Sequence, residues 1–319
     1  MRAVAVVLAL SAATACGSSS TPPAAAPSTS TSSTPASTTS VAAAPSTTAA
    51  TTGPCGGRPL PAAYAHVLVI VMENHGYADV AAHSPYLNHL AAQCGLATNY
   101  RAVAHPSLPN YLAMTSGGTQ GLTDDCTACS SGAPSIFQQV GADGWKAYEE
   151  DMPSAGYTGA ASGTYAKKHN PAAYFTAVAS AYATRAVPMG TPSAGVLSDD
   201  LAHDTLPKFG FLTPNLCNDE HDCPVARGDA WLSRWVPAIL ASPAYRAGTT
   251  ALFISYDEDD TTGGNRVYTV AAGPSVAPGT TSGAAFDHYS LLATIEDLLG
   301  VARLGSAATA TSMRTAFGM

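Results

Sequence analysis

Two apolar runs that each end in acidic residues constrain the fold of this 319-residue chain more than any other feature. Residues 66–72 form a continuous run rich in β-branched side chains, and residues 251–256 form a second one. Shorter runs of the same kind occupy residues 209–213 and 267–272. Strands that are apolar on both faces are typical of a parallel sheet covered by helices. We therefore expect these four segments to lie in one buried sheet.

Segments with helical periodicity separate these runs. They occupy residues 86–93, 108–115, 134–141, 231–241 and 288–299. In the last of these segments the apolar residues fall on one helical face. Strands that alternate with helices predict an α/β domain, in which ligands bind beyond the carboxyl ends of the strands.

Oxygen-bearing side chains stand at the ends of the two principal runs. Glu73 and Asn74 follow the first run, and Asp257 and Glu258 follow the second. Carboxylate and amide oxygens are ligands for Mg, Ca, Mn or Zn. Acidic residues also end strands as solvated turns, and for either pair alone that interpretation is the simpler one. Their joint occurrence after two similar runs predicts a site for one divalent metal ion at one edge of the sheet.

Ser107 is the candidate nucleophile. It lies between Pro106 and Pro109, which stiffen the chain at a turn, and a helical pattern begins directly after it. A serine at a helix N-terminus lies near backbone N–H groups that favour anions, and a metal ion would activate its hydroxyl for attack on phosphorus. A serine at this position is also a common helix N-cap, and composition alone favours the cap.

The N-terminal part of the chain has the composition of an export signal followed by a tether. A charged start, a short apolar stretch and small residues predict a signal peptide over residues 1–15. Cys16 then occupies the position of a lipidated cysteine, with simple secretion as the alternative. Residues 17–54 contain only Gly, Ser, Thr, Pro, Ala and one Val, so we expect residues 16–54 to be a disordered tether. The folded domain is predicted to span residues 55–319.

Six further cysteines fit an exported protein with three disulfides. Cys217 and Cys223 bracket a short loop and are predicted to pair. Cys126 and Cys129 are predicted to pair as well, which leaves Cys55 with Cys94 by elimination. A zinc site and a redox-active pair are the alternatives for Cys126 and Cys129, although a second ligand pair and the strand-then-helix setting are both missing.

Composition narrows the classes of partner. The formal net charge is −8, and charged residues make up only 11% of the chain. Nucleic-acid binding requires clustered Lys and Arg, so we expect no nucleic-acid partner. Apolar runs are shorter than the roughly 18 residues of a spanning helix, so membrane contact is expected only through a lipid on Cys16. The tether favours a monomer.

Four segments together resemble a known family. They are residues 72–75 (Met-Glu-Asn-His), 107–110 (Ser-Leu-Pro-Asn), 256–258 (Tyr-Asp-Glu) and 287–290 (Asp-His-Tyr-Ser). Their order resembles the bacterial phosphoesterase family of secreted acid phosphatases and phospholipases C, within the alkaline-phosphatase-like superfamily. Residues 218–223 add a segment similar to one in the SapM-like acid phosphatases. The resemblance implies a three-layer α/β sandwich with a mostly parallel central sheet.

The resemblance also implies a role for each matching residue. Glu73, Asn74, Asp257 and Glu258 resemble metal ligands, and Ser107 resembles the serine that becomes phosphorylated. His221 and His288 resemble histidines that bind phosphoryl oxygens or protonate the leaving group. Asn110 resembles a phosphate-binding residue, and His105 is a weaker candidate beside it. His221 has the alternative of an ordinary loop residue, and His288 that of a neighbour to the N-cap Asp287. Six other histidines, His169 among them, receive no role.

We therefore expect an exported bacterial protein, either a cell-surface lipoprotein or a secreted one, that acts as a metal-dependent acid phosphatase. Its expected substrate is a phosphorylated small molecule or a lipid headgroup, and a histidine that is cationic in mild acid suits the leaving-group step. The alternatives are a phosphodiesterase of phospholipase C type and a surface lipoprotein that binds an anion without turnover. The lack of a paired-arginine signal and of an extra domain favours the monoesterase.

Overall fold

A mixed sheet organises residues 53–319, the part of the chain that this computed structural model describes. The predicted signal peptide, Cys16 and residues 17–52 lie outside the described residues. In spatial order along the sheet, the strands are β10 (Thr280–Ser282), β2 (Gly95–Arg101), β9 (Arg266–Ala272), β8 (Thr250–Tyr256), β1 (His66–Met72), β7 (Phe209–Thr213), β3 (Trp145–Glu149) and β6 (Ala186–Pro188), while β11 (Phe286–Asp287) pairs with β2.

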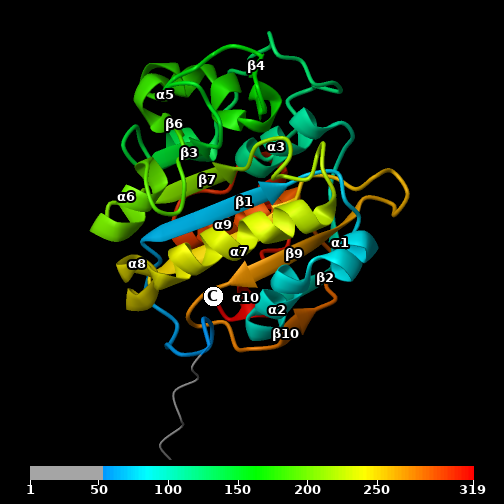
Figure 1. Cartoon of the computed structure of the whole chain (residues 1–319), viewed down its shortest axis with the longest axis vertical. Helices are drawn as coiled ribbons and strands as arrows, with labels where there is room; N and C mark the ends of the chain where they lie inside the picture. The colour runs from blue at the N-terminus through cyan, green and yellow to red at the C-terminus, as the bar shows by residue number, and fades with distance from the viewer. Residues whose placement is uncertain (1–52) are drawn as a thin grey trace, which may run out of the picture. The chain divides into compact units, whose positions relative to one another are not determined.

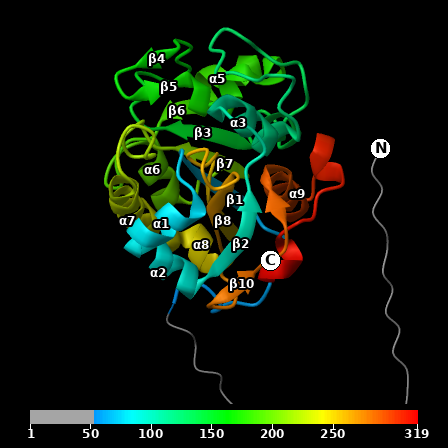
Figure 2. The same cartoon turned by 90° about the vertical axis from the view of Figure 1, so that its right-hand side faces the viewer.

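The centre of the sheet is parallel, as the apolar runs predict. Strand β1 lies between β7 and β8, and its register with β8 runs from the pair His66 and Thr250 to the pair Met72 and Tyr256. Strand β9 is antiparallel to β8 and to β2. The carboxyl ends of β1, β7 and β8 therefore meet at one edge of the sheet, which lies to the right in Figure 1 and faces the reader in Figure 2.

Helices cover both faces of the sheet (Figure 1). One layer consists of α1 (Tyr77–His83), α2 (Pro85–Gln93), α6 (Val196–His203), α7 (Val225–Ala241) and α8 (Pro243–Ala247). The other layer contains α3 (Ser107–Ser116), α4 (Ile136–Gln139) and α9 (His288–Leu299), and the chain ends with η4 (Gly305–Ala308) and α10 (Arg314–Phe317). The predicted three-layer α/β arrangement is confirmed. Helix α3 ends at Gly117, where φ is +72° and a side chain would collide with the carbonyl of Leu304.

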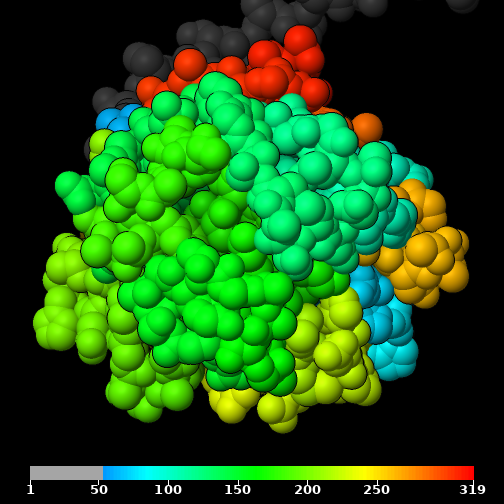
Figure 3. Space-filling model, turned by 90° about the horizontal axis from the view of Figure 1, so that it is seen from above, coloured from blue at the N-terminus to red at the C-terminus, as the bar shows by residue number. Residues whose placement is uncertain are grey.

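A segment of short elements covers one end of the domain, and we call residues 150–185 the cap. Figure 3 shows the cap in green as it spreads over that end. Its elements are β4 (Ala161–Ser162), β5 (Tyr165–Ala166), three 3-10 turns η1 (Lys167–His169), η2 (Pro171–Tyr174) and η3 (Thr176–Val178), and α5 (Ala179–Arg185). Turns η1 and η2 pack against α3, so the cap places Lys168 and His169 beside the helix that begins with Ser107.

Two of the three predicted disulfides are confirmed, Cys55 with Cys94 and Cys217 with Cys223. The third prediction is wrong, because Cys126 and Cys129 are free cysteines. Cys126 Sγ accepts the Cys129 N–H at 3.0 Å, while Cys129 Sγ lies 3.1 Å from the Cys126 carbonyl oxygen. Each sulfur is thus engaged with the backbone of the other residue. Within residues 53–319 no helix is both long and apolar enough to cross a membrane.

Candidate active site

The two predicted pairs of oxygen ligands converge at the carboxyl edge of the sheet. Strands β1 and β8 are paired to their last residues, so Glu73 and Asp257 leave the sheet side by side. The Asp257 N–H donates to the Met72 carbonyl at 2.9 Å. Asp257 Oδ1 accepts the N–H groups of Asn74 at 3.3 Å and of Glu258 at 2.7 Å. The predicted ligand residues therefore lie together, although Asn74 contacts Asp257 through its backbone N–H, with a positive φ of 57°.

Ser107 faces this cluster from the first residue of α3. Its side chain is 1% exposed, and its Oγ donates to Glu73 Oε2 at 3.1 Å. The N-cap position belongs to Pro106, and no side chain caps this helix end. The hydroxyl of Ser107 is therefore directed to a carboxylate of the cluster and not to the helix backbone, which separates the nucleophile interpretation from the N-cap interpretation.

Burial gives the carboxylates of this edge unusual protonation equilibria. Burial, together with the charges of Asp257 and Asp219, raises the pKa of Glu73 well above its ordinary range. Burial also raises the pKa of Asp257 to about 7, of Glu258 to about 9 and of Asp219 to about 8. Removal from water penalises the charged form, and neighbouring carboxylates add to that penalty. These carboxylates therefore bind protons more readily than carboxylates in water, and a bound cation would relieve the same repulsion.

A divalent cation fits this donor set. Asp257 Oδ2 is buried and has no hydrogen-bond partner among the described residues. Buried carboxylate oxygens without partners are costly unless a cation neutralises them. The oxygens of Glu73, Asp257 and Glu258 are hard donors that suit such an ion. The chemistry of the residues therefore supports the predicted metal site, whose identity and stoichiometry remain predictions.

His169 is the functional candidate that the sequence analysis missed. Its ring is buried, with Nε2 3.2 Å from Glu73 Oε1 and Nδ1 3.2 Å from Asp219 Oδ2. Burial, followed by the charge of Lys168, lowers the pKa of His169 well below its usual value, so the ring is neutral. It lies in a 3-10 turn of the cap, where no periodic pattern marks a functional position. Only its neighbours in space reveal it.

His221 completes a second group of ligand atoms. One atom each from Glu73, His169 and His221 lie within 4.8 Å of one another. His221 Nδ1 is 2.7 Å from Asp222 Oδ1, and its Nε2 is 3.1 Å from Lys168 Nζ. Because a lysine can only donate, Nε2 accepts and the proton of the neutral ring lies on Nδ1. The structure thus brings predicted His221 to the site, within reach of the carboxylate cluster.

The structure does not support the predicted role of His288 in phosphoryl binding. The ring is fully buried, its Nδ1 lies 2.9 Å from the Tyr100 hydroxyl and its Nε2 lies 2.6 Å from the Asp257 carbonyl oxygen. Both ring nitrogens are therefore occupied by protein groups. Burial lowers the pKa of His288 to about 4, which keeps it neutral. The ring thus links Tyr100 to the backbone at Asp257. Asp287 does cap α9, as its side chain accepts the Ser290 N–H.

Asn110 and His105 lie at the opposite side of the cluster. Asn110 Oδ1 accepts the N–H groups of Val103 and Ala104, so this oxygen closes the loop before α3. Its amide nitrogen lies 3.3 Å from Glu258 Oε2. His105 Nδ1 lies 2.9 Å from the same Glu258 oxygen. Both residues thus border the cluster, and their contact with phosphate stays a prediction.

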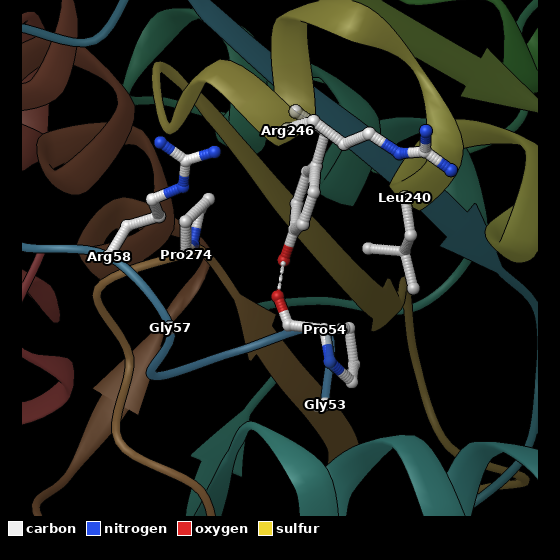
Figure 4. A pocket seen from close by; sticks show the side chains of 8 residues that line it. Gly53, Pro54, Gly57, Arg58, Leu240, Arg246 and Pro274 are labelled. Carbon is white, nitrogen blue, oxygen red and sulfur yellow. Dashed lines mark hydrogen bonds between the residues drawn. The ribbon is translucent and has the colours of Figure 1, made fainter. Parts of the chain in front are cut away.

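The acidic loop after Glu258 is a closed turn. Asp259 accepts the N–H groups of Thr261, Gly263 and Asn265, which satisfies its carboxylate with backbone donors. A cavity of about 400 Å³ lies elsewhere, at the amino end of β8 (Figure 4). Its lining includes Arg58 and Arg246 but no carboxylate and no histidine. That cavity therefore lacks the groups that the predicted chemistry requires.

Comparison with solved structures shows the fold. A protein of the alkaline phosphatase superfamily from Vibrio parahaemolyticus superposes with a TM-score of 0.53 at 14% identity, covering 80% of this chain and 71% of that one. The lipoteichoic acid synthase LtaP from Listeria monocytogenes superposes with a TM-score of 0.53 at 10% identity, covering 81% and 78%. The predicted alkaline-phosphatase-like fold is confirmed.

Comparison of sequences shows the family. Phosphatidylinositol-3-phosphatase from Mycobacterium tuberculosis is 34% identical over 260 residues, which cover 80% of this chain and 83% of that protein. The phosphate-repressible acid phosphatase of Penicillium chrysogenum is 33% identical over 255 residues, which cover 76% of this chain and 61% of that protein. Residues 80–302 match the sequence profile of the Phosphoesterase family. This chain belongs to the phosphoesterase family.

Proposed function

We propose that this chain is an exported, metal-dependent acid phosphatase that hydrolyses phosphate monoesters through a phosphoserine at Ser107. The observation that carries the proposal is the position of Ser107 Oγ, 3.1 Å from Glu73 Oε2 in a cluster of buried carboxylates. Membership of the phosphoesterase family and similarity to proteins named as phosphatases support this reaction class.

The residues that would hold a cation are Glu73, Asn74, Asp257 and Glu258, with Ser107 beside them. When bound, a divalent cation would supply positive charge for phosphoryl oxygens and lower the pKa of a neighbouring hydroxyl. Two backbone N–H groups at the strand ends hold Asp257 Oδ1. They thereby fix the position of the other oxygen, Oδ2, which has no hydrogen-bond partner among the described residues. Such orientation by a rigid sheet is what a metal ligand requires.

Two displacements at phosphorus make up the proposed reaction. Ser107 Oγ transfers its proton to Glu73 and forms a bond to phosphorus, while the bond from phosphorus to the leaving oxygen breaks. His221 in its protonated form donates a proton to that oxygen. Water then attacks the phosphoserine and gives a proton to His221, the Ser107 oxygen leaves and recovers its proton from Glu73, and inorganic phosphate is released. His169 faces Glu73 Oε1 with one ring nitrogen and Asp219 Oδ2 with the other, so we assign it the role of orienting these two carboxylates.

Substrate and location follow from the relatives. One relative is named as a phosphatase of phosphatidylinositol 3-phosphate and others as acid phosphatases, so we propose a phosphate monoester on a small molecule or a lipid headgroup. Two disulfides form in the described residues, which supports export because disulfides persist in oxidising compartments. Lipidation of Cys16 is part of this proposal, and labelling with radioactive palmitate, lost in Cys16→Ser, would test it.

The test of the reaction uses the full chain with its disulfides formed. Hydrolysis of p-nitrophenyl phosphate would be followed from about pH 4 to 9, a range that spans histidine titration. The variants are Ser107→Ala and, as a matched control, Ser116→Ala, because Ser116 lies at the other end of α3 and donates to the Leu112 carbonyl. Acid-quenched protein would be digested, and the peptide with Ser107 weighed for an added phosphoryl group.

We expect the wild type and Ser116→Ala to be active and Ser107→Ala to be inactive, with activity lost to chelator and restored by a divalent metal. Turnover that survives Ser107→Ala would exclude this nucleophile. Hydrolysis of bis-p-nitrophenyl phosphate without hydrolysis of the monoester would replace the phosphatase by a phosphodiesterase. Folded, metal-loaded protein that hydrolyses neither compound would leave only the anion-binding alternative.

A further inference from the structure

Lys168 is a basic residue at the site that neither the family resemblance nor the sequence motifs singled out. Its Nζ lies 3.1 Å from His221 Nε2, at the border of the group formed by Glu73, His169 and His221. The side chain is 18% exposed, so it is mostly enclosed by protein. The positive charge of Lys168 lowers the pKa of Glu73, of Asp219 and of Glu258, in each case against the larger effect of burial.

Asp125 links Lys168 to the helix that begins with Ser107. Asp125 Oδ2 accepts from Lys168 Nζ at 2.9 Å, and Asp125 Oδ1 accepts the N–H of Leu108 at 3.0 Å. Leu108 directly follows Ser107, so one carboxylate joins the lysine to the first turn of α3. A lysine with several rotatable bonds is thereby held at a fixed distance from the serine hydroxyl.

Charge balance shows why the site needs this lysine. The edge carries the carboxylates of Glu73, Asp219, Asp257 and Glu258, all buried. If a bound cation ionises these four carboxylates, their charge exceeds that of one divalent ion, and a phosphate monoester adds further negative charge. A fixed ammonium group beside the cluster supplies the missing positive charge without depending on pH near neutrality.

We propose that Lys168 binds the phosphoryl group of the substrate, with Asp125 as its positioning residue. The proposal rests on the phosphatase function proposed above. Lys168 Nζ donates to a non-bridging phosphoryl oxygen, while Asp125 keeps the ammonium group over the site. The contact involves no bond making, so its main effect is on binding of the dianion and of the product phosphate.

The adjacent lysine provides a matched control. Lys167 Nζ donates to the Thr127 carbonyl at 2.8 Å and lies 4.9 Å from the centre of the Tyr174 ring, in contact with the cap and not with the carboxylates. Lys167→Met and Lys168→Met therefore remove the same charge from neighbouring positions of one 3-10 turn. Only the second substitution removes a charge from the site.

The experiment uses full-length, metal-loaded protein. For the wild type, Lys168→Met, Lys168→Arg, Asp125→Asn and Lys167→Met, kcat and KM would be measured with p-nitrophenyl phosphate, together with the inhibition constant of inorganic phosphate. Direct calorimetric binding of phosphate and a thermal melt would accompany each variant. A charge-assisted hydrogen bond contributes about 1.5–3 kcal/mol, which corresponds to roughly tenfold or more in affinity.

We expect Lys168→Met to raise KM and the phosphate inhibition constant at least about tenfold while kcat falls much less. Lys168→Arg should recover most of the affinity, Asp125→Asn should give an intermediate loss, and Lys167→Met should match the wild type. Unchanged KM and phosphate affinity in Lys168→Met would overturn the proposal for Lys168. Activity of the wild type in the same assay would still support the phosphatase function. If Lys168→Met fails to fold, unaltered affinity in Asp125→Asn would overturn it. Wild-type protein without turnover or phosphate binding would instead refute the proposed function itself.

Discussion

The two edges of the central sheet differ in how their polar groups are satisfied. At the carboxyl edge, Glu73, Asp219 and Asp257 are buried together, and Asp257 Oδ2 lacks a hydrogen-bond partner among the described residues. At the amino edge, His66 Nδ1 is paired with the Pro207 carbonyl at 2.9 Å, and the Tyr245 hydroxyl donates to the Pro54 carbonyl (Figure 4). The disulfide from Cys55 to Cys94 fastens the chain just after Pro54.

This contrast separates function from stability within one sheet. Repulsion among buried carboxylates costs folding free energy, and a fold retains it only where other interactions compensate. The satisfied hydrogen bonds and the disulfide of the amino edge provide such compensation. Substitutions at the carboxyl edge should therefore reduce activity without reducing stability, and substitutions at the amino edge should do the reverse.

The largest expected effect is that of Asp257→Asn. The substitution keeps the oxygen that accepts two backbone N–H groups but removes one charge and the free carboxylate oxygen. We expect kcat/KM to fall by about a thousandfold or more, because cation binding is impaired. The metal-free protein should become more stable by about 1 kcal/mol, because repulsion is relieved. Steady-state kinetics and denaturant unfolding in chelator measure both quantities.

His66→Gln is the control from the other edge for that prediction. It should leave kcat/KM within about twofold and reduce the free energy of unfolding by about 1 kcal/mol through the altered hydrogen bond. A metal-free Asp257→Asn protein that is less stable than the wild type would contradict the contrast between the edges, because the carboxylates would then stabilise the fold.

Removal of the disulfide at the amino edge should give the next largest effect. The double substitution Cys55→Ala and Cys94→Ala opens a link between residues 39 positions apart. We expect a loss of about 2–4 kcal/mol in the free energy of unfolding, because the unfolded chain gains freedom. Activity of the folded protein should be retained, which urea unfolding and assays in its absence will show. A large loss of activity in a fully folded variant would show that the amino edge also contributes to activity, and would contradict the contrast.

The parts of this site that a sequence can predict are those tied to strong periodic patterns. Strand β1 spans the same residues as the apolar run at 66–72, and the parallel pairing of β1 with β8 then forces Glu73 and Asp257 together. Ser107 was found from its position before a helical pattern. These inferences need only the side-chain pattern and the rule that parallel strands end at one edge.

The parts that were missed depend on tertiary contacts. Strand β2, with the sequence Gly-Leu-Ala-Thr-Asn-Tyr-Arg, carries no marked apolar run, so its Tyr100 was not expected beside His288. Without that partner, the histidine ring could not be assigned to the core. Lys168 and His169 lie in a single 3-10 turn, whose position over α3 follows from the packing of the cap and from no local pattern.

A smaller effect tests whether a raised pKa by itself marks function. Glu296 in α9 belongs to neither edge, yet burial raises its pKa to about 8, and its Oε1 accepts the Leu304 N–H at 2.9 Å. The folded-state pKa exceeds the unfolded value, so its contribution to stability is complete in acid below about pH 4 and is lost as pH rises toward 8. Glu296→Gln should flatten that decline and leave kcat/KM unchanged. Lost activity in this variant would show that a buried carboxylate outside the carboxyl edge also contributes to the reaction.

The smallest effect is expected at the free cysteines. Cys126 and Cys129 are free and partly exposed. Cys126→Ser should change the free energy of unfolding by less than about 0.5 kcal/mol, well below the effect of losing the Cys55 disulfide. Native protein should react with two equivalents of a thiol reagent, one from each of these two cysteines, provided that Cys16 is lipidated or removed. Native protein without reactive thiols, together with a loss of several kcal/mol in Cys126→Ser, would show that this loop is fastened in the same way as the amino edge.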